Sequence, residues 1–371
     1  MFKKLVKVAL LACVFAVPLT IITPSVDACT RIVWADSKGQ CLLVGRTLDW
    51  QADTQSNLWM FPRGMVRESL IHHDNPLVWT SKYASIVASA YDITSLDGLN
   101  EKGLAGHLLW LDEASYGQRH VNIPAMSLSY WLQYYLDNFA TVSEALTYTQ
   151  THPYELWPVY FPPAKTWVKF HLALEDASGD SAIIEMVNGK TTVYHGTKFK
   201  VMTNSPIYSA QLQNIKQYQG LGGQKALPGS TASADRFTRA VYYSSALQAP
   251  ISSEQARNTL EGVLNNVAEP MENPAWTGST VSPTFWYSII DLSTKTYYFK
   301  YLKNASWIWV NFNDFNMQAG APVMMLDTAK QTNLSGDVSK YFKPVKAFIP
   351  LETPDGFIPP VNKTIMIKKI K

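Results

Sequence analysis

Residues 29–35 of the chain are Cys-Thr-Arg-Ile-Val-Trp-Ala, and residues 41–48 are Cys-Leu-Leu-Val-Gly-Arg-Thr-Leu. Both runs are rich in apolar and β-branched residues, and the segment between them, Asp-Ser-Lys-Gly-Gln, has the composition of a turn. The pattern predicts a β-hairpin that begins directly after Cys29.

The register of this hairpin brings charged residues close to Cys29. If Ala35 pairs with Cys41, Cys29 lies opposite Thr47, next to Arg46 and Asp49. Residues three apart point to opposite faces of a regular strand, so the strand must end or bulge near Leu48 for both charges to face the thiol. The spacing alone is equally compatible with an ordinary surface ion pair between Arg46 and Asp49.

Residues 1–28 have the order of a secretory signal peptide: three lysines, an apolar run from residue 8 to 22, and small residues at Val26 and Ala28. The apolar run is shorter than the roughly 20 residues of a membrane span, and Pro18 interrupts it. We expect cleavage after Ala28, which makes Cys29 the first residue of a mature periplasmic or secreted protein without stable membrane association.

A lipid anchor is the alternative interpretation of the same region. Val26-Asp27-Ala28-Cys29 and Leu10-Leu11-Ala12-Cys13 each resemble a lipoprotein signal. Lipidation at Cys29 consumes both its thiol and its amine, so it predicts a lipid-anchored or secreted binding module without catalysis. The mass of the mature N-terminus distinguishes the two interpretations.

Composition argues against several other classes of protein. The formal net charge is +3, from 32 basic and 29 acidic residues, but residues 1–28 hold three of the lysines and one aspartate, which leaves 29 against 28. This balance does not support a nucleic-acid-binding surface. The chain has no HExxH or GxSxG motif and no phosphate-binding loop, so we expect neither a metal nor a cofactor. We expect Cys41 to be a buried strand residue, because a bridge to Cys29 would destroy a nucleophile.

Further elements are expected along residues 29–371, which we interpret as one catalytic domain. Strands are predicted at residues 85–91, 103–111, 168–175, 181–187, 284–292, 296–302 and 307–312, and helices at 126–138, from 141 to before 153, 234–247 and 252–267. Groups of strands alternate with pairs of helices, which favours an α+β layered fold over a doubly wound sheet.

A cysteine at a mature N-terminus combines a nucleophile and a base in one residue. A free α-amine has a pKa of roughly 7.7–8.0, against about 10.4 for lysine, so it can accept a proton near neutral pH. The thiolate is the reactive form of cysteine, and a nearby cation such as Arg46 favours it. A carboxylate such as Asp49 can orient the amine.

Five short motifs occur in order along the chain: 29–31 (Cys-Thr-Arg), 45–50 (Gly-Arg-Thr-Leu-Asp-Trp), 97–104 (Asp-Gly-Leu-Asn-Glu-Lys-Gly-Leu), 203–206 (Thr-Asn-Ser-Pro), and 227–229 with 235–237 (Leu-Pro-Gly and Asp-Arg-Phe). With them the sequence resembles the choloylglycine hydrolase and penicillin V acylase family of N-terminal-nucleophile hydrolases. Residues 57–64 and 108–111 resemble its Gram-negative branch.

The resemblance implies a role for each of five residues. Cys29 is the nucleophile with its own amine as base, Arg46 holds the thiolate, and Asp49 holds the amine. Asn204 donates to the oxyanion and Arg236 completes the polar network. The resemblance also implies a four-layer αββα sandwich, a homotetramer and hydrolysis of a small acyl amide such as penicillin V, with conjugated bile salts and N-acyl homoserine lactones as alternatives.

Trp110 departs from the pattern of many relatives, which place Asn or Tyr at this position. Indole offers a single N–H, so we expect the second oxyanion donor to be a backbone amide. Trp110 and Trp50 are expected to bind substrate as an aromatic pocket wall, although an arbitrary Trp is more often a core residue.

Overall fold

The structure is a computed structural model that describes residues 29–35, 41–72, 75–120, 122–270, 282–331 and 333–354. The expected signal peptide, the expected turn at residues 36–40 and His73 lie outside these ranges. No helix in the described ranges is long and apolar enough to cross a membrane.

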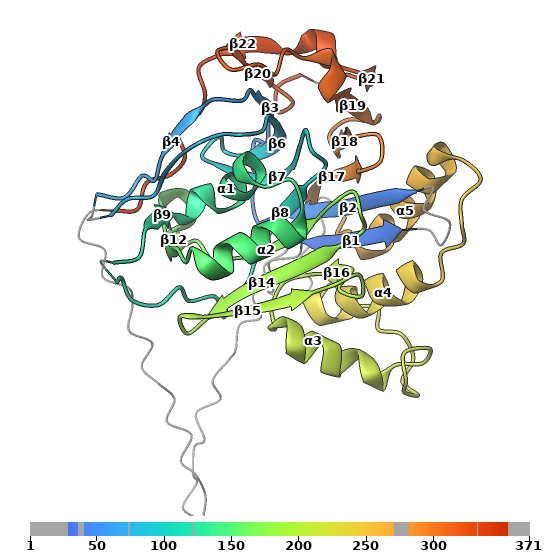
Figure 1. Ribbon diagram of the computed structural model, residues 1–371. Helices are drawn as coiled ribbons and strands as arrows, with labels where there is room; N and C mark the ends of the chain where they lie inside the picture. Colours follow the sequence, from blue (N-terminus) through green and yellow to red (C-terminus); the bar gives the residue numbers. More distant parts are fainter. Residues whose placement is uncertain are drawn as a thin grey trace, which may run out of the picture.

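The first of two large sheets holds the predicted N-terminal hairpin at its centre. Its order is β16 (Val201–Met202), β1 (Thr30–Ala35), β2 (Leu42–Asp49), β17 (Thr284–Asp291), β18 (Thr296–Tyr301), β19 (Ile308–Asn311) and β21 (Gly336–Asp337). Two long helices, α4 (Ser233–Ser245) and α5 (Ser253–Val267), cover its outer face (Figure 1).

The second sheet is antiparallel throughout. Its order is β15 (Lys190–His195), β14 (Ser181–Val187), β13 (Phe170–Glu175), β8 (Ala105–Trp110), β7 (Thr94–Asn100), β6 (Ser85–Ala90), β3 (Leu58–Phe61), β20 (Val323–Leu326) and β22 (Lys343–Val345). Helix α1 (Trp131–Asn138) packs on its outer face, and α2 (Val142–Thr151) follows. The inner faces of the two sheets meet, which confirms the predicted αββα layers.

Two paired glycines let α1 approach the second sheet closely. Gly98 of β7 pairs with Gly106 of β8. A Cβ atom on Gly98 would lie 2.8 Å from Leu136, and one on Gly106 would lie 2.6 Å from Leu132, both in α1. A side chain at either glycine would therefore require the packing between α1 and the sheet to rearrange.

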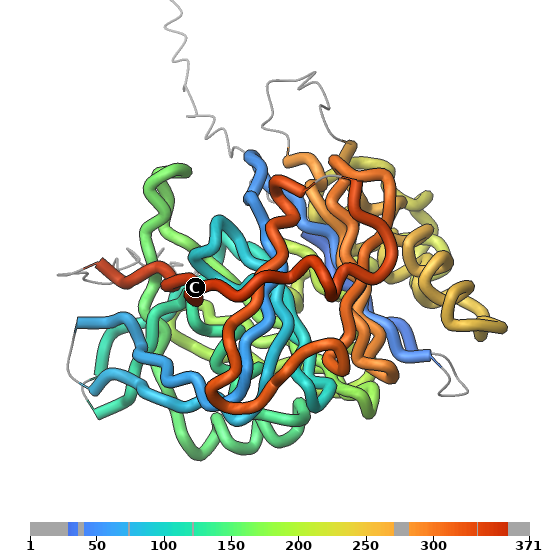
Figure 2. Tube along the Cα trace, turned by 90° about the horizontal axis from the view of Figure 1, so that it is seen from above, coloured from blue at the N-terminus to red at the C-terminus, as the bar shows by residue number. Residues whose placement is uncertain are grey.

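Short elements complete the described chain. They are β4 (Val66–Glu68) with β5 (Val78–Thr80), β9 (Ala125–Ser127) with β10 (Glu155–Trp157), β11 (Tyr160–Phe161) with β12 (Thr166–Trp167), and α3 (Tyr208–Asn214). The C-terminal segment, red in Figure 2, crosses the molecule after β22.

The predicted hairpin forms, but its register differs by one residue. Ala35 pairs with Leu42 and Thr30 with Thr47, because Cys41 precedes β2 instead of opening it. The prediction that Cys29 lies opposite Thr47 is therefore wrong. Cys41 is buried, as expected.

The helix predicted over residues 126–138 begins later than expected. Its first residues form β9, which pairs in parallel with β10, and the α-helix begins at Trp131. Tertiary strand pairing thus overrides the helical spacing of apolar residues there. The next helix and α5 each begin with a side-chain cap: Thr141 accepts from the Glu144 amide and Ser252 from the Gln255 amide, each at 3.1 Å.

Candidate active site

Cys29 lies where the ends of several elements meet. It directly precedes β1, while Arg46 and Asp49 belong to the end of β2. Asn204 follows β16, and Arg236 projects from the first turns of α4. All five side chains are buried, and the contacts described below join them into one cluster.

The strand irregularity expected near Leu48 is present, and it is centred on the neighbouring strand. Asp49 pairs with Thr284 and Leu48 with Trp286, so β17 contains one extra residue at this point. β2 itself ends at Asp49. The bulge places Thr284 against the Asp49 carboxylate, with an Oγ1–Oδ1 distance of 2.5 Å.

Arg46 is the cation beside Cys29. Its Nη2 lies 4.0 Å from the Cys29 sulfur and donates to the Leu108 carbonyl at 2.7 Å. Nη1 donates to the Leu96 carbonyl and lies 3.5 Å from Asp97 Oδ2. These contacts fix the guanidinium between the two sheets. Burial raises the pKa of the Cys29 thiol, and the positive charge of Arg46 opposes that increase.

Asp49 is a buried carboxyl that two hydroxyls hold in place. It accepts hydrogen bonds from Thr284 and, at 3.2 Å, from Thr47. Arg236 Nη1 lies 4.0 Å from Oδ2. Burial raises the pKa of Asp49 to about 8, although Arg236 and the two hydroxyls lower it. In the uncleaved chain the nitrogen of Cys29 is part of a peptide bond and brings no positive charge to this carboxyl.

Arg236 connects Cys29 to Asn204. Nη1 donates to the Cys29 carbonyl at 2.8 Å and to Thr30 Oγ1 at 2.7 Å, and Nη2 donates to Asn204 Oδ1 at 3.0 Å. Asn204 Nδ2 donates to the Trp110 carbonyl at 2.9 Å. The orientation of the carboxamide is therefore fixed, and because an amide nitrogen carries two N–H groups, the second can donate to a ligand.

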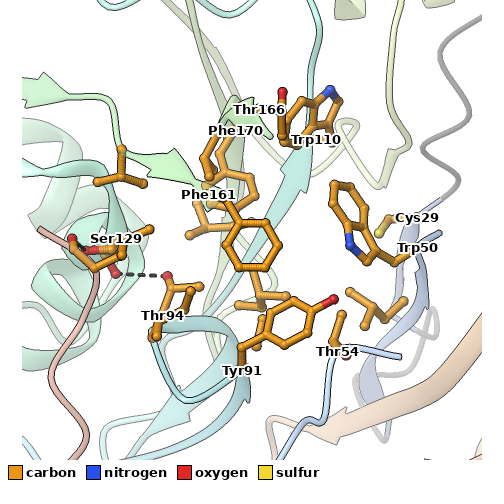
Figure 3. Close-up of a pocket in the computed structure, with 18 of the residues that line it drawn as sticks. Cys29, Trp50, Thr54, Tyr91, Thr94, Trp110, Ser129, Phe161, Thr166 and Phe170 are labelled. Atoms are coloured by element: carbon orange, nitrogen blue, oxygen red, sulfur yellow. Dashed lines mark hydrogen bonds between the residues drawn. The ribbon is translucent and has the colours of Figure 1, made fainter. Parts of the chain in front are cut away.

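A largely apolar pocket of about 720 Å³ opens beside Cys29 (Figure 3). Trp50 and Trp110 are part of its wall, with ring centroids 5.5 Å apart. The indole N–H of Trp110 donates to Asp112 at 2.6 Å, so this donor is not available to an oxyanion.

A chain of buried charges extends from Arg46 into the space between the sheets. His107 of β8 contacts Asp97 Oδ2 through Nδ1 at 2.5 Å and contacts Glu175 through Nε2. Glu175 in turn pairs with Arg31 of β1. Burial lowers the pKa of His107, but the two carboxylates outweigh it and raise that pKa overall. The imidazole is thus favoured in its charged form.

Sequence reasoning missed several residues of this site. Thr284 was expected only as the start of a strand, and His107 was not singled out at all. Leu351, which also lines the pocket, belongs to no expected element. Contacts of this kind join segments that are distant in sequence. They leave no local pattern that sequence reasoning could have detected.

The fold is that of an N-terminal-nucleophile amidohydrolase. A profile of the linear amide C–N hydrolases, choloylglycine hydrolase family, matches residues 29–330, and the chain belongs to that family. It is 34% identical over 344 residues to the penicillin V acylase of Pectobacterium atrosepticum, covering 86% of this chain and 91% of that protein.

Other relatives share the same architecture. The bile salt hydrolase/transferase of Clostridium perfringens is 24% identical over 320 residues, covering 78% of this chain and 94% of its own. Penicillin V acylase from Agrobacterium tumefaciens superposes with a TM-score of 0.78 at 35% identity, covering 87% and 99% of the two chains. A mutant of the Clostridium perfringens conjugated bile acid hydrolase superposes with a TM-score of 0.69 over 82% and 98%, and its 21% identity indicates the fold alone.

Proposed function

We propose that the mature chain is an amidase of the penicillin V acylase type, which hydrolyses the amide between an aromatic or apolar acyl group and an amine. The observation that carries this proposal is the Cys29 thiol at the wall of a pocket whose lining is almost entirely apolar. Trp50 and Trp110 provide flat surfaces suited to a phenoxyacetyl ring. The similarity to two penicillin V acylases supports the same substrate class.

The proposed reaction begins with proton transfer from the Cys29 thiol to its own α-amine. The sulfur then attacks the amide carbonyl carbon, and the second N–H of Asn204 stabilises the oxyanion. Collapse breaks the carbon–nitrogen bond, the α-ammonium protonates the departing amine, and a thioester remains. Water attacks the thioester, its proton passes through the amine to the sulfur, and the free acid leaves.

The surrounding residues position these groups. Arg46 favours the thiolate through its charge, and Asp49 orients the α-amine. Arg236 donates a hydrogen bond of 2.8 Å to the main-chain carbonyl of Cys29, which fixes the backbone of that residue. Positioning of reacting groups at such distances supplies a large part of enzymatic rate enhancement.

The proposal includes export and processing. Cleavage after Ala28 is needed to free the amine of Cys29, which places the mature enzyme in the periplasm or outside the cell. We also propose a homo-oligomer, a tetramer by resemblance to the family. Intact-mass measurement of exported protein tests the cleavage, and light scattering coupled to gel filtration tests the assembly.

A substrate panel tests the activity. Mature protein beginning at Cys29 is assayed with penicillin V, penicillin G, a glycine-conjugated bile salt and a long-chain N-acyl homoserine lactone, by detection of the amine released. Cys29→Ala serves as the matched control. We expect penicillin V to give the highest kcat/KM. Preferred cleavage of the bile salt would instead indicate a bile salt hydrolase. Failure to cleave any of the amides would refute the proposal.

A further inference from the structure

Residues 346–354 form a strap that follows β22 and reaches the far end of the acyl pocket. In Figure 3 Cys29 and Trp50 lie at one end of this pocket, and Ser129 and Thr94 lie at the other. Leu351 of the strap contacts the far end, because its carbonyl accepts a hydrogen bond of 2.7 Å from the Ser129 hydroxyl. Leu351 is one of the residues that line the pocket, and it is only partly buried.

The strap is anchored through its main chain around Leu351. The Leu351 amide donates to the Ile93 carbonyl at 2.9 Å, and the Leu351 carbonyl accepts from both Ser127 and Ser129 at 2.7 Å. Two residues later, the Thr353 amide donates to the Leu70 carbonyl at 3.2 Å. The position of the Leu351 backbone therefore does not depend on its own side chain.

An aromatic contact holds the strap before it reaches the pocket. Phe348 lies with its ring centroid 5.1 Å from that of Trp59 and 5.5 Å from that of Phe61, both in β3. Edge-to-face pairs of this kind add to the burial of apolar area. The strap is thus attached to β3 of the second sheet independently of anything bound in the pocket.

The strap lies outside the part of the chain that defines the family. The family profile matches residues 29–330, whereas Leu351 lies 21 residues beyond that match. The catalytic end of the pocket is therefore formed by shared family elements. Its far end is bordered in part by a segment that lies beyond the profile match.

We propose that Leu351 is a specificity-determining residue that limits the length of the acyl group. This inference rests on the proposed amidase function, since it assumes that the acyl group extends from Cys29 along the apolar pocket. A side chain at the end of the pocket far from Cys29 is contacted only by acyl groups long enough to reach it. Its size therefore selects among long acyl groups and has no effect on short ones.

Substitutions of opposite size make the proposal testable. Leu351→Ala removes three carbon atoms from the end of the pocket and admits longer chains, whereas Leu351→Phe fills that space. Each methylene newly buried is expected to raise kcat/KM about fourfold. Glu352→Ala is the matched control, because Glu352 is exposed on the same strap and contacts only His72, at 3.5 Å, among the described residues.

The experiment measures kcat/KM for p-nitroanilides of linear acids from butanoic to tetradecanoic, with phenoxyacetyl p-nitroanilide included. We expect Leu351→Ala to move the optimum by about two to three carbons toward longer chains, Leu351→Phe to move it toward shorter ones, and Glu352→Ala to match the wild type. Butanoyl p-nitroanilide should be cleaved equally by all, which also verifies that the variants fold; if Leu351→Ala does not fold, Leu351→Val replaces it.

The possible failures are distinct. If the wild type cleaves none of the amides, the proposed function is wrong. If it cleaves them and the chain-length profile is the same in all folded variants, the function stands and Leu351 does not limit acyl length. A uniform loss across all lengths in Leu351→Ala and Leu351→Phe would also overturn the inference, because it would indicate a general structural role.

Discussion

Replacement of Arg46 by methionine tests whether this buried cation sets the reactivity of Cys29. Methionine is similar in length and carries no charge. At the 4.0 Å between Nη2 and the sulfur, two unit charges at an effective dielectric constant of about 20 attract by about 4 kcal/mol, or about three pKa units. Water that enters the altered site would replace part of the lost electrostatic stabilisation of the thiolate, so we expect the pKa of the Cys29 thiol to rise by about one to three units.

The thiol pKa is measured from the rate of iodoacetamide alkylation as a function of pH. A Cys41→Ser background leaves Cys29 as the single cysteine of the mature chain. Below the thiol pKa, each unit of increase reduces the thiolate fraction tenfold, so kcat/KM at neutral pH should fall by about ten- to a thousandfold. Part of this loss should be recovered at higher pH.

Arg46→Lys separates the effect of charge from that of structure. Both substitutions disturb the contacts with Asp97 and the Leu108 carbonyl, and removal of one partner of a buried pair typically costs about 3–5 kcal/mol of stability. Lysine retains the positive charge, so its thiol pKa should rise less than that of the methionine variant. An unchanged thiol pKa in folded Arg46→Met would refute the assignment of Arg46 as the group that favours the thiolate.

Three further predictions concern other residues of the site. Cys29→Ser should abolish turnover in a folded protein, whereas Cys41→Ser should retain it; loss of activity on blocking Cys41 alone would reverse the assignment. Asn204→Ala should lower kcat about a hundredfold or more, whereas Trp110→Ala should mainly raise KM for phenoxyacetyl amides; steady-state kinetics would contradict this if Trp110→Ala reduced kcat at constant KM. The pKa of Asp49 is raised from 3.8 to about 8 in the folded, uncleaved chain. Protonated Asp49 therefore contributes to the free energy of unfolding below about pH 4, and this contribution is lost as the pH rises from about 4 to 8. Thermal unfolding of the Cys29→Ala full-length chain at pH 5 to 9 should therefore vary less with pH when Asp49→Asn is added, and equal slopes would argue against the raised pKa.

The hairpin shows what the sequence could predict and where it failed. Alternating and β-branched residues indicated β1 and β2, and their pairing brought Arg46 and Asp49 near Cys29. The register was wrong by one residue, because turn composition does not fix the number of residues in a loop.

The more distant parts of the site depended on tertiary contacts. Asn204 and Arg236 were expected only through resemblance to a family, since no local pattern places them near Cys29. Thr284 and Leu351 reach the site through a strand bulge and a C-terminal strap. Such contacts depend on how distant segments pack, which neither periodicity nor propensity records.

The buried charges between the sheets also bear on how the protein folds. Arg31 and Arg46 are direct partners in the β1–β2 ladder, and like charges placed opposite each other destabilise an isolated hairpin. Glu175 and Asp97, on the opposing sheet, accept these two arginines, with His107 between the carboxylates. The hairpin that follows Cys29 therefore gains its full stability only after the second sheet has formed. A shift of one sheet relative to the other by one residue would leave buried charges unpaired. The ion pairs between the sheets therefore disfavour any packing that would misplace the residues around Cys29.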